Sequence, residues 1–367
     1  MSLLRSRARL AILLMAGALL VYPLVMPRFW VLSIGAQSII LGVVALSLVF
    51  MAGYGGMISL AQAALAGFAA YMVALASLDA GLPPIPAALI ALALATLAGA
   101  IVGAIASRSQ GIYFLMLTLA LAVGFFYVVL QNYDLFEGHI GFAGILGPTG
   151  QPRENPAAFY YLCLALAAVA YFGLRYLVRT PLGLTFQGIR DNPRRMRALG
   201  YWVELHRVVI FAIGGLVAGL SGVLGVWYRG NISPGIVDLT RTIDVLIIAV
   251  IGGLGYPIGA FVGAVFFVLI DIFASSVTIF GFSFDERFNT LIGLGFVLVV
   301  LLAPNGLVAL ADRGWAAGNR RFRLLRPGVS PLAAAPVEAA WADPSPLPSR
   351  DTPPETASEG GGTNRDA

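Results

Sequence analysis

The sequence has no lysine: all 23 basic residues among its 367 are arginine. Without lysine the chain cannot form the phosphate-binding loop of a P-loop ATPase, a Schiff base or a lysine general base. A single cysteine, Cys163, excludes an intrachain disulfide and argues against a cysteine-based metal site. The two histidines, His139 and His206, form no cluster. These absences predict a protein that is not an enzyme and that needs no cofactor.

Charge is also scarce, since 11% of the residues are charged and 59% are hydrophobic. Soluble domains carry about 25% charged residues, and a helix crosses the bilayer core with roughly 20 apolar residues. The composition therefore predicts an all-α integral membrane protein. Long stretches without charge predict ten transmembrane segments, which are 10–26, 30–51, 57–78, 85–106, 112–131, 157–176, 207–228, 238–252, 258–280 and 288–310.

Two glycine-rich stretches divide uncharged runs that are too long for one helix. Residues 29–78 are divided at Gly53-Tyr54-Gly55-Gly56, and residues 245–270 at Gly252-Gly253-Leu254-Gly255-Tyr256-Pro257. The eighth segment, 238–252, reaches only about 22 Å at 1.5 Å per residue, short of the bilayer core. It is either a tilted crossing helix or a half-helix that faces a cavity.

Arginine placement predicts the orientation, because cytoplasmic flanks collect positive charge. With the N-terminus inside and ten crossings, sixteen arginines lie inside, five lie outside, and two more fall in the distal tail. Both termini are therefore predicted to be cytoplasmic. A re-entrant eighth segment is disfavoured, because it would place the arginines of 313–326 outside. The five outer arginines are Arg28, Arg153, Arg229, Arg241 and Arg287.

The two ends of the chain differ from the segments between them. Arg5, Arg7 and Arg9 before an apolar run are compatible with a signal peptide, but no small-residue cleavage site follows, which favours a retained first helix. Residues 327–367 are rich in Pro, Gly, Ser and Glu, which is typical of disorder. The expected organisation is a transmembrane domain over 1–312 and a cytoplasmic, largely disordered tail over 313–367.

The loop at about 177–206 is predicted to lie inside and to hold a short helix. Asn192 can cap it, Pro193 suits its first turn, and Gly200 suits the left-handed position after its end. Met196 and Leu199 share a face, with arginines around the remainder. Physical reasoning leaves two readings equally open: a basic loop at anionic lipid headgroups, or a coupling helix that seats in a cytoplasmic partner.

Several stretches form an ordered set of motifs. They are Gly53-Tyr54-Gly55-Gly56 leading to Ser59-Leu60-Ala61-Gln62-Ala63, Gly111-Ile112-Tyr113-Phe114, Arg179-Thr180-Pro181-Leu182-Gly183 with Ile189 to Gly200, Val250-Ile251-Gly252-Gly253 with Gly259 and Gly263, and Pro304-Asn305-Gly306-Leu307. In this order and spacing the chain resembles the permease subunits of ABC importers for branched-chain amino acids, specifically the M-type permease. Ala61, Leu65 and Ala69 depart from its usual Gly, Phe and Gly, and residues 138–144 lack the Thr-Gly-Gly pattern often seen there.

The resemblance implies an ABC importer permease fold in a bacterial plasma (inner) membrane. It implies four kinds of partner: a homologous second permease, two cytoplasmic ATPases, an extracytoplasmic binding protein and the lipid bilayer, with no role for nucleic acid. Urea or a short amide is the alternative substrate class within the same family. The implied contacts to the ATPase are Arg190, Asp191, Asn192, Arg194, Arg195, Arg197, Leu199 and Gly200.

Few polar residues fall inside the predicted spans, and five are candidates for the translocation path. Ser59 and Gln62 would share a helix face beyond the glycine break, with interhelical hydrogen bonding as the competing role. Tyr113 and Thr118 offer hydrogen-bonding groups but are weaker candidates. Asp271 lies in mid-segment, where an ionised carboxylate is costly; it is either protonated or bonded to Ser or Thr on a neighbour, and we expect a gating or path role.

Other features support structural rather than chemical roles. Glycines at four-residue spacing predict close helix packing, mainly within the chain, at Gly99 and Gly103, Gly215 and Gly219, and Gly259 and Gly263. Arg241 and Asp244 are expected to pair with each other. An intramembrane enzyme would need a cluster of carboxylates or histidines that the sequence lacks. An ion-coupled carrier working alone remains an alternative, although such carriers often hold several buried charges.

Overall fold

A computed structural model describes residues 17, 19–138, 140–276, 278–279, 282–283 and 306–308. These residues lie in the first of two compact units of the chain, residues 1–324. Most of the predicted last segment, 288–310, and all of the tail, 313–367, lie outside the described residues. Of the predicted first segment, 17 and 19–25 are helical.

The described residues are mainly helical. The longer elements are α2 (Gln37–Gly55), preceded by the π-helical η1 (Trp30–Ala36), α3 (Gln62–Leu78), α4 (Pro84–Ala106), α5 (Ile112–Gln131), α7 (Pro156–Leu177), α8 (Pro181–Asp191), α10 (Val203–Arg229), α11 (Leu239–Gly252) and α12 (Pro257–Ser276). The shorter elements are α6 (Tyr133–Phe136), α9 (Pro193–Ala198), η2 (Pro234–Ile236), β1 (Phe142–Ala143), β2 (Asn231–Ile232), β3 (Thr278–Ile279) and β4 (Phe282–Ser283).

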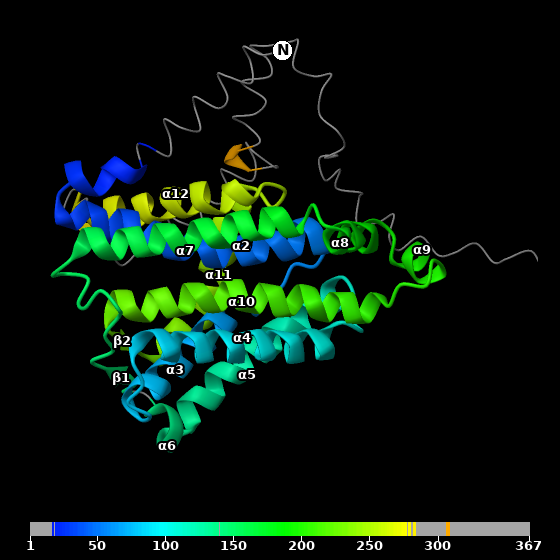
Figure 1. Ribbon diagram of the computed structural model, residues 1–367, viewed down its shortest axis with the longest axis horizontal. Helices are drawn as coiled ribbons and strands as arrows, with labels where there is room; N and C mark the ends of the chain where they lie inside the picture. Colours follow the sequence, from blue (N-terminus) through cyan, green and yellow to red (C-terminus); the bar gives the residue numbers. More distant parts are fainter. Residues whose placement is uncertain are drawn as a thin grey trace, which may run out of the picture. The chain divides into compact units, whose positions relative to one another are not determined.

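The long helices lie side by side in one bundle (Figure 1). Helix α10 packs on α2, α3 and α4, while α12 packs on α2 and α11. Helices α8 and α9 lie at one end of the bundle, and β1, β2 and α6 lie at the opposite end (Figure 1). There Phe142 of β1 pairs with Ile232 of β2 in an antiparallel register, which joins the loop before α7 to the loop after α10.

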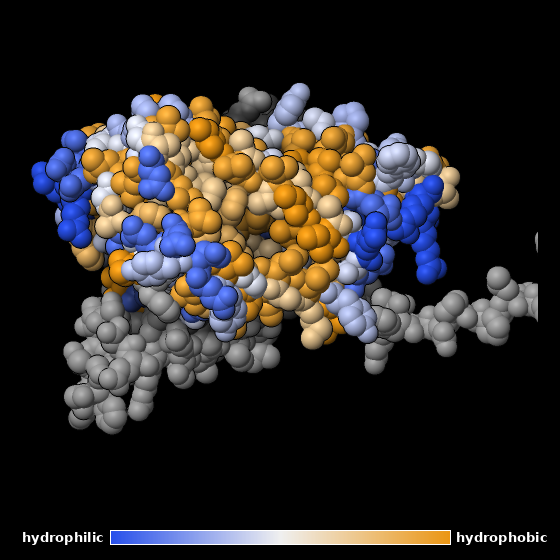
Figure 2. Space-filling view, turned by 90° about the horizontal axis from the view of Figure 1, so that it is seen from below, coloured by the Kyte–Doolittle hydropathy of each residue, from blue (hydrophilic) through white to orange (hydrophobic). Residues whose placement is uncertain are grey.

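The helices differ sharply in how much of their surface the bundle covers. In the most apolar part of η1–α2, 78% of the residues are buried, compared with 28% in α4 and 22% in α5. A helix that is apolar all round belongs in the interior of a bundle, as α2 does here. Helices α4, α5 and α7 instead expose large apolar side chains such as Ile101, Met116 and Phe172. Figure 2 shows this hydrophobic surface between two hydrophilic ends.

The described part of the chain holds five helices long and apolar enough to cross a membrane, or six if a bent pair counts as one span. The bent pair consists of η2–α11 and α12, and the chain bends by 117° between them, at residues 253–256. These helices confirm a multi-pass helical membrane protein. The full count of ten segments stays a prediction, as does the cytoplasmic position of both termini.

Several predicted boundaries are wrong. Helix α2 ends at Gly55 rather than at 51. Helix α3 begins at Gln62 rather than at 57, because residues 56–61 are not helical and bond instead to Thr118 of α5 and to Ser59 within the segment. Helix α12 ends at Ser276 rather than 280, and strand β3 begins two residues later. Helix α10 also starts earlier than its predicted segment, at Val203.

The predicted close packing through glycine is confirmed between α4 and α10. A Cβ on Gly99 would lie 2.6 Å from the Phe211 carbonyl oxygen, and one on Gly215 would lie 2.6 Å from that of Ala95. Both distances are below van der Waals contact, so only glycine allows this approach. These glycines therefore serve packing within the chain.

Candidate functional site

Helix α8 is an amphipathic helix that follows α7 and that the sequence analysis did not predict. The Thr180 side chain accepts a hydrogen bond from the Gly183 amide, and Pro181 occupies the first turn. Phe186 and Ile189 are fully buried, and the Phe186 ring contacts that of Phe50 on α2. Helix α8 is thereby fixed against the core helix of the bundle.

The short helix α9 has the ends that the sequence predicted. Asn192 Oδ1 accepts a hydrogen bond from the Arg195 amide at 2.9 Å, and Pro193 is the first residue of the helix. Gly200 follows the helix with a φ of +87°, and its amide donates to the Arg197 carbonyl. Caps at both ends give this two-turn helix a defined shape despite its length.

Helix α9 contains no buried residue among its six. Leu199 and Trp202 beside it are 66% and 74% exposed, and the side chains of Arg194 and Arg195 are also exposed. Met196, on the same face as Leu199, is half-buried beside Gly188 of α8. The helix thus presents a basic surface with apolar side chains at one end of the bundle, where α9 lies in Figure 1.

Arg190 differs from the arginines of α9 because its side chain bonds within the chain. Its Nη1 donates to the Gly53 carbonyl oxygen at 2.6 Å, and its Nε donates to Asp191 Oδ1 at 2.9 Å. The Gly53 carbonyl is one of the last in α2, so it has no partner within the helix. Arg190 therefore caps the end of α2 and ties α8 to it.

We call residues 56–61, between α2 and α3, the first break. Gly56 ends α2 with a φ of +66°, and a Cβ there would lie 2.6 Å from Cγ of Arg190. The Leu60 amide donates to Thr118 Oγ1 on α5, and the Ala61 amide donates to Ser59 Oγ. Side chains thus satisfy two amides that would otherwise be unpaired and buried.

The structure brings Ser59, Gln62 and Thr118 together around the first break, but Ser59 does not share a helix face with Gln62 because it precedes α3. All three side chains are buried. Gln62 Oε1 accepts a hydrogen bond from Ser47 on α2 at 2.9 Å, and its Nε2 lies 2.7 Å from the Met51 sulfur. These contacts support the interhelical role for Gln62.

The other two path candidates lie apart from this group. Tyr113 on α5 is 67% exposed. Asp271 on α12 is half-buried and lies within electrostatic reach of Asp244 on α11. Asp244 in turn pairs with Arg241 at 3.4 Å, which confirms that predicted pair.

We call residues 253–256, between α11 and α12, the second break. This break contacts the end of α2. A Cβ on Gly53 would lie 2.7 Å from the Leu254 carbonyl oxygen. A Cβ on Gly306, near the end of the predicted last segment, would collide with Gly253. Arg190, the end of α2 and the second break therefore form one continuous series of contacts.

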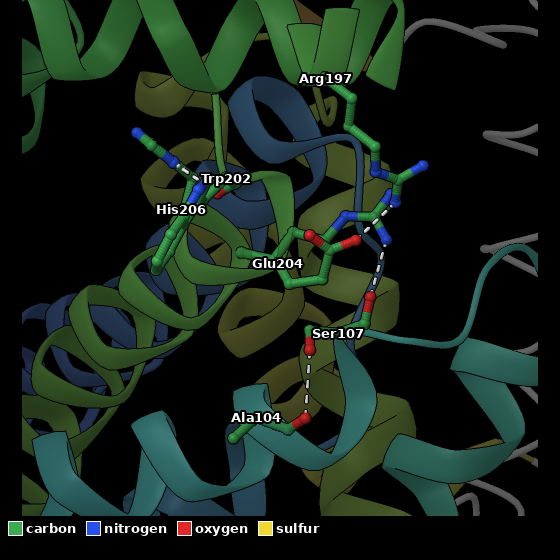
Figure 3. A network of polar contacts seen from close by, with 7 residues as sticks. Ala104, Ser107, Arg197, Trp202, Glu204 and His206 are labelled. Carbon is green, nitrogen blue, oxygen red and sulfur yellow. Dashed lines mark hydrogen bonds and ion pairs between the residues drawn. The ribbon is translucent and has the colours of Figure 1, made fainter. Parts of the chain in front are cut away.

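Arg207 belongs to a polar network at the same end of the bundle. From the sequence it was predicted only to lie on the cytoplasmic side. Arg207 is 7% exposed, and its Nη1 donates to the Ser107 carbonyl oxygen at the end of α4. Ser107 bonds back to Ala104, while Arg197 of α9 pairs with Glu204 at 2.6 Å (Figure 3). A cation at a helix carboxyl end is favourable. Nothing in the local sequence marks Arg207, because its partner is 100 residues away.

Comparison with known proteins gives one family. Residues 30–303 match the family described as branched-chain amino acid transport system / permease component. The chain is 25% identical over 293 residues to the high-affinity branched-chain amino acid transport system permease protein LivM of Escherichia coli (strain K12). That alignment covers 73% of this chain and 65% of the relative. A probable LivM permease of Methanocaldococcus jannaschii is 25% identical over 60% of this chain and 68% of its own length.

Proposed function

The chain belongs to the family of permease components of branched-chain amino acid transport systems, and from this premise we propose that it is one membrane subunit of an ATP-driven importer. A homologous permease, two cytoplasmic ATPases and an extracytoplasmic binding protein would complete the complex. The proposed cargo is leucine, isoleucine or valine. Because the chain lacks lysine, a partner must supply the Walker A loop.

One observation carries the proposal: a capped, exposed basic helix, α9, lies at the same end of the bundle as the series of contacts that begins at Arg190. A helix with no buried residue and exposed Leu199 and Trp202 offers a docking surface for another protein. Arg194, Arg195, Arg197 and Leu199 are the proposed ATPase contacts on it. Asn192 and Gly200 have a different role, since they fix its ends.

Arg190 and Asp191 have a second role in this scheme. Movement of α9 when the ATPases close would displace α8, because the two helices meet at Asn192. Through Arg190 that displacement reaches the Gly53 carbonyl, and through Gly53 it reaches Leu254. Alternating access requires that such a displacement shift whole helices against one another.

In the proposed orientation the end of the bundle with α8 and α9 faces the cytoplasm, and the chain lies in a bacterial plasma membrane. The arginine distribution supports this orientation, because the α8–α9 region is the most arginine-rich loop between helices. Ten crossings with both termini inside would follow from it.

The test is a charge reversal of α9. We expect the triple variant Arg194→Glu, Arg195→Glu and Arg197→Glu to lose capture of the two ATPases in detergent extracts while it still inserts in the membrane. The control variant Arg175→Glu with Arg179→Glu changes charge at the same end without altering α9. Full ATPase capture by the triple variant would overturn the coupling role.

Substrate and energy source need their own measurement. Uptake of radiolabelled leucine, isoleucine or valine by vesicles holding the complex, driven by enclosed ATP and insensitive to a proton ionophore, is the expected result. Uptake of urea in place of the amino acids would change the substrate. Loss of uptake on adding the ionophore would indicate an ion-coupled carrier instead.

A further inference from the structure

A cavity of about 770 Å³ lies at the end of the bundle opposite α8 and α9. It is formed where η1 begins, where α10 ends and where the chain enters α7. Its volume is in the range of binding sites for small molecules and headgroups. Its main polar lining residues are Arg28, Arg153, Arg229, Ser33, Gln151 and Tyr228. We call it the arginine cavity.

Three arginines line this one cavity without an opposing charge. Arg28, Arg153 and Arg229 form no ion pair and no side-chain hydrogen bond with any residue that the structure describes. No aspartate or glutamate is among the lining residues. Three cationic side chains around a cavity that has no acidic one give it a positive potential, which favours an anionic ligand.

The distribution of arginine along the chain makes this gathering unusual. Only five arginines are predicted on the outer side, and three of them line this one cavity. Of the other two, Arg241 pairs with Asp244, and Arg287 lies outside the described residues. The scarce outer positive charge is therefore concentrated at one position rather than spread over the loops.

The lining also excludes some ligands. A free amino acid carries an ammonium group as well as a carboxylate, and the cavity offers no acidic side chain to bind the ammonium. The guanidinium fork suits phosphate oxygens, which it can bind in a bidentate manner. A phosphate-bearing anion therefore fits the cavity better than the transported solute does.

The apolar part of the lining indicates the source of that phosphate. Phe29, Leu32 and Leu146 contribute to the wall, and Phe29 and Leu146 are 60% and 52% exposed. Trp30 beside them is also exposed, and aromatic residues next to arginine are typical of the membrane–water interface. Apolar side chains next to arginine match a glycerophospholipid, whose phosphate adjoins its acyl chains.

We propose that the arginine cavity binds the phosphate of an anionic phospholipid at the membrane interface. The assignment goes beyond the transport function, and only its placement in the outer leaflet rests on the proposed orientation. A bound lipid would join η1, the end of α10 and the loop before α7, which meet at this cavity.

The test uses the full chain purified in detergent and native mass spectrometry. Phosphatidylglycerol is titrated against phosphatidylcholine, which has the same phosphate but a compensating cation. We expect the unaltered protein to bind phosphatidylglycerol about tenfold more tightly. Each of the changes Arg28→Gln, Arg153→Gln and Arg229→Gln should weaken that binding about tenfold, since each removes a charge-assisted hydrogen bond. The control is Arg179→Gln, an exposed arginine just before α8, at the opposite end of the bundle.

Four outcomes would overturn the proposal. The first is equal binding of the two lipids by the unaltered protein, which requires no variant. The second is unchanged phosphatidylglycerol binding in a folded variant that carries Arg28→Gln, Arg153→Gln and Arg229→Gln together. The third is inorganic phosphate that binds as tightly as phosphatidylglycerol, which would make the site one for a free anion. The fourth is capture of a secreted binding protein that depends on the three arginines while phosphatidylglycerol shows no preference, which would assign the cavity to a protein partner.

Discussion

The two helix breaks of this protein are linked through the end of α2 but are held in different ways. Around the first break, side chains from other elements bond the backbone: the Leu60 amide donates to Thr118 Oγ1 of α5, and Arg190 of α8 donates to the Gly53 carbonyl oxygen just before the break. In the second break the backbone hydrogen bonds between described residues are local, such as that from the Tyr256 amide to the Gly253 carbonyl, and the glycines beside it pack closely.

The difference indicates which break can receive a displacement of α8 and which can pass it to other helices. A break bonded by a side chain of α8 moves when α8 moves, since a charge-assisted hydrogen bond is directional and strong. A break whose neighbouring glycines leave no room for a Cβ is closely packed, so it transmits displacement by packing. The first break is therefore suited to receive motion, and the second is suited to pass it on.

The largest expected effect tests the packing of α11 against α12 beside the second break. Gly252→Val would place side-chain atoms against the Gly259 carbonyl oxygen, where even a Cβ collides. We expect a loss of about 3 kcal/mol or more in the free energy of unfolding, seen as a lower melting temperature of the purified protein. Gly255→Ala in the same break is the control, because nothing lies within 4 Å of its Cβ position. Equal stability of the two variants would contradict the packing account.

An intermediate effect is expected at the link from α8 to the first break. Arg190→Gln removes the charge-assisted hydrogen bond to Gly53, which costs about 1–2 kcal/mol at this partly exposed position. Transport should fall at least about tenfold while ATPase capture is retained, because the break no longer follows α8. Uptake and capture are measured together in the assembled complex.

The control for Arg190→Gln is Arg179→Gln, an exposed arginine just before α8 whose side chain bonds to no residue that the structure describes. It should leave both uptake and capture unchanged. If Arg190→Gln loses ATPase capture as α9 variants do, Arg190 is a docking residue rather than a positioning residue.

The smallest effect concerns the bond from α5. Thr118→Val leaves the partly buried Leu60 amide without its acceptor and should lower the free energy of unfolding by about 1 kcal/mol. Thr118→Ser keeps the hydroxyl and should recover most of the lost free energy of unfolding. Hydrogen exchange of the Leu60 amide gives an independent readout, and we expect it to be faster in the Thr118→Val variant than in the Thr118→Ser variant. Identical exchange in both would show that the hydroxyl does not hold the break.

Local patterns in the sequence predicted the features that depend on neighbouring residues. Asn192, Pro193 and Gly200 predicted α9 and both its ends, because capping acts within one turn. Glycine spacing predicted close packing at Gly99 and Gly215, although not that these two helices, α4 and α10, pack on each other. Arg241 and Asp244 pair as expected from a separation of three residues.

Features that depend on distant residues were missed or wrong. Ser59 was placed on a helix because nothing between 57 and 61 forbids one; the acceptor that holds Leu60 out of a helix is 58 residues away. The ATPase contact predicted for Arg190 stays a prediction, but the bond of its side chain to Gly53, 137 residues away, was not predicted. Helix α8 was missed although Thr180-Pro181 is a helix-start signal, because the contact of Phe186 with Phe50 of α2 that fixes it joins residues far apart in the chain.

The sequence by itself determined that this is a helical membrane protein, since the long uncharged stretches need no tertiary context. Because glycine acts locally, the sequence also indicated two helix breaks, although the first lies at 56–61 rather than at 53–56. Only the tertiary structure decided what those breaks touch and which arginines lie together. Both depend on packing between segments far apart in the chain, and a side chain's partner across such a distance is set by the fold rather than by its neighbours.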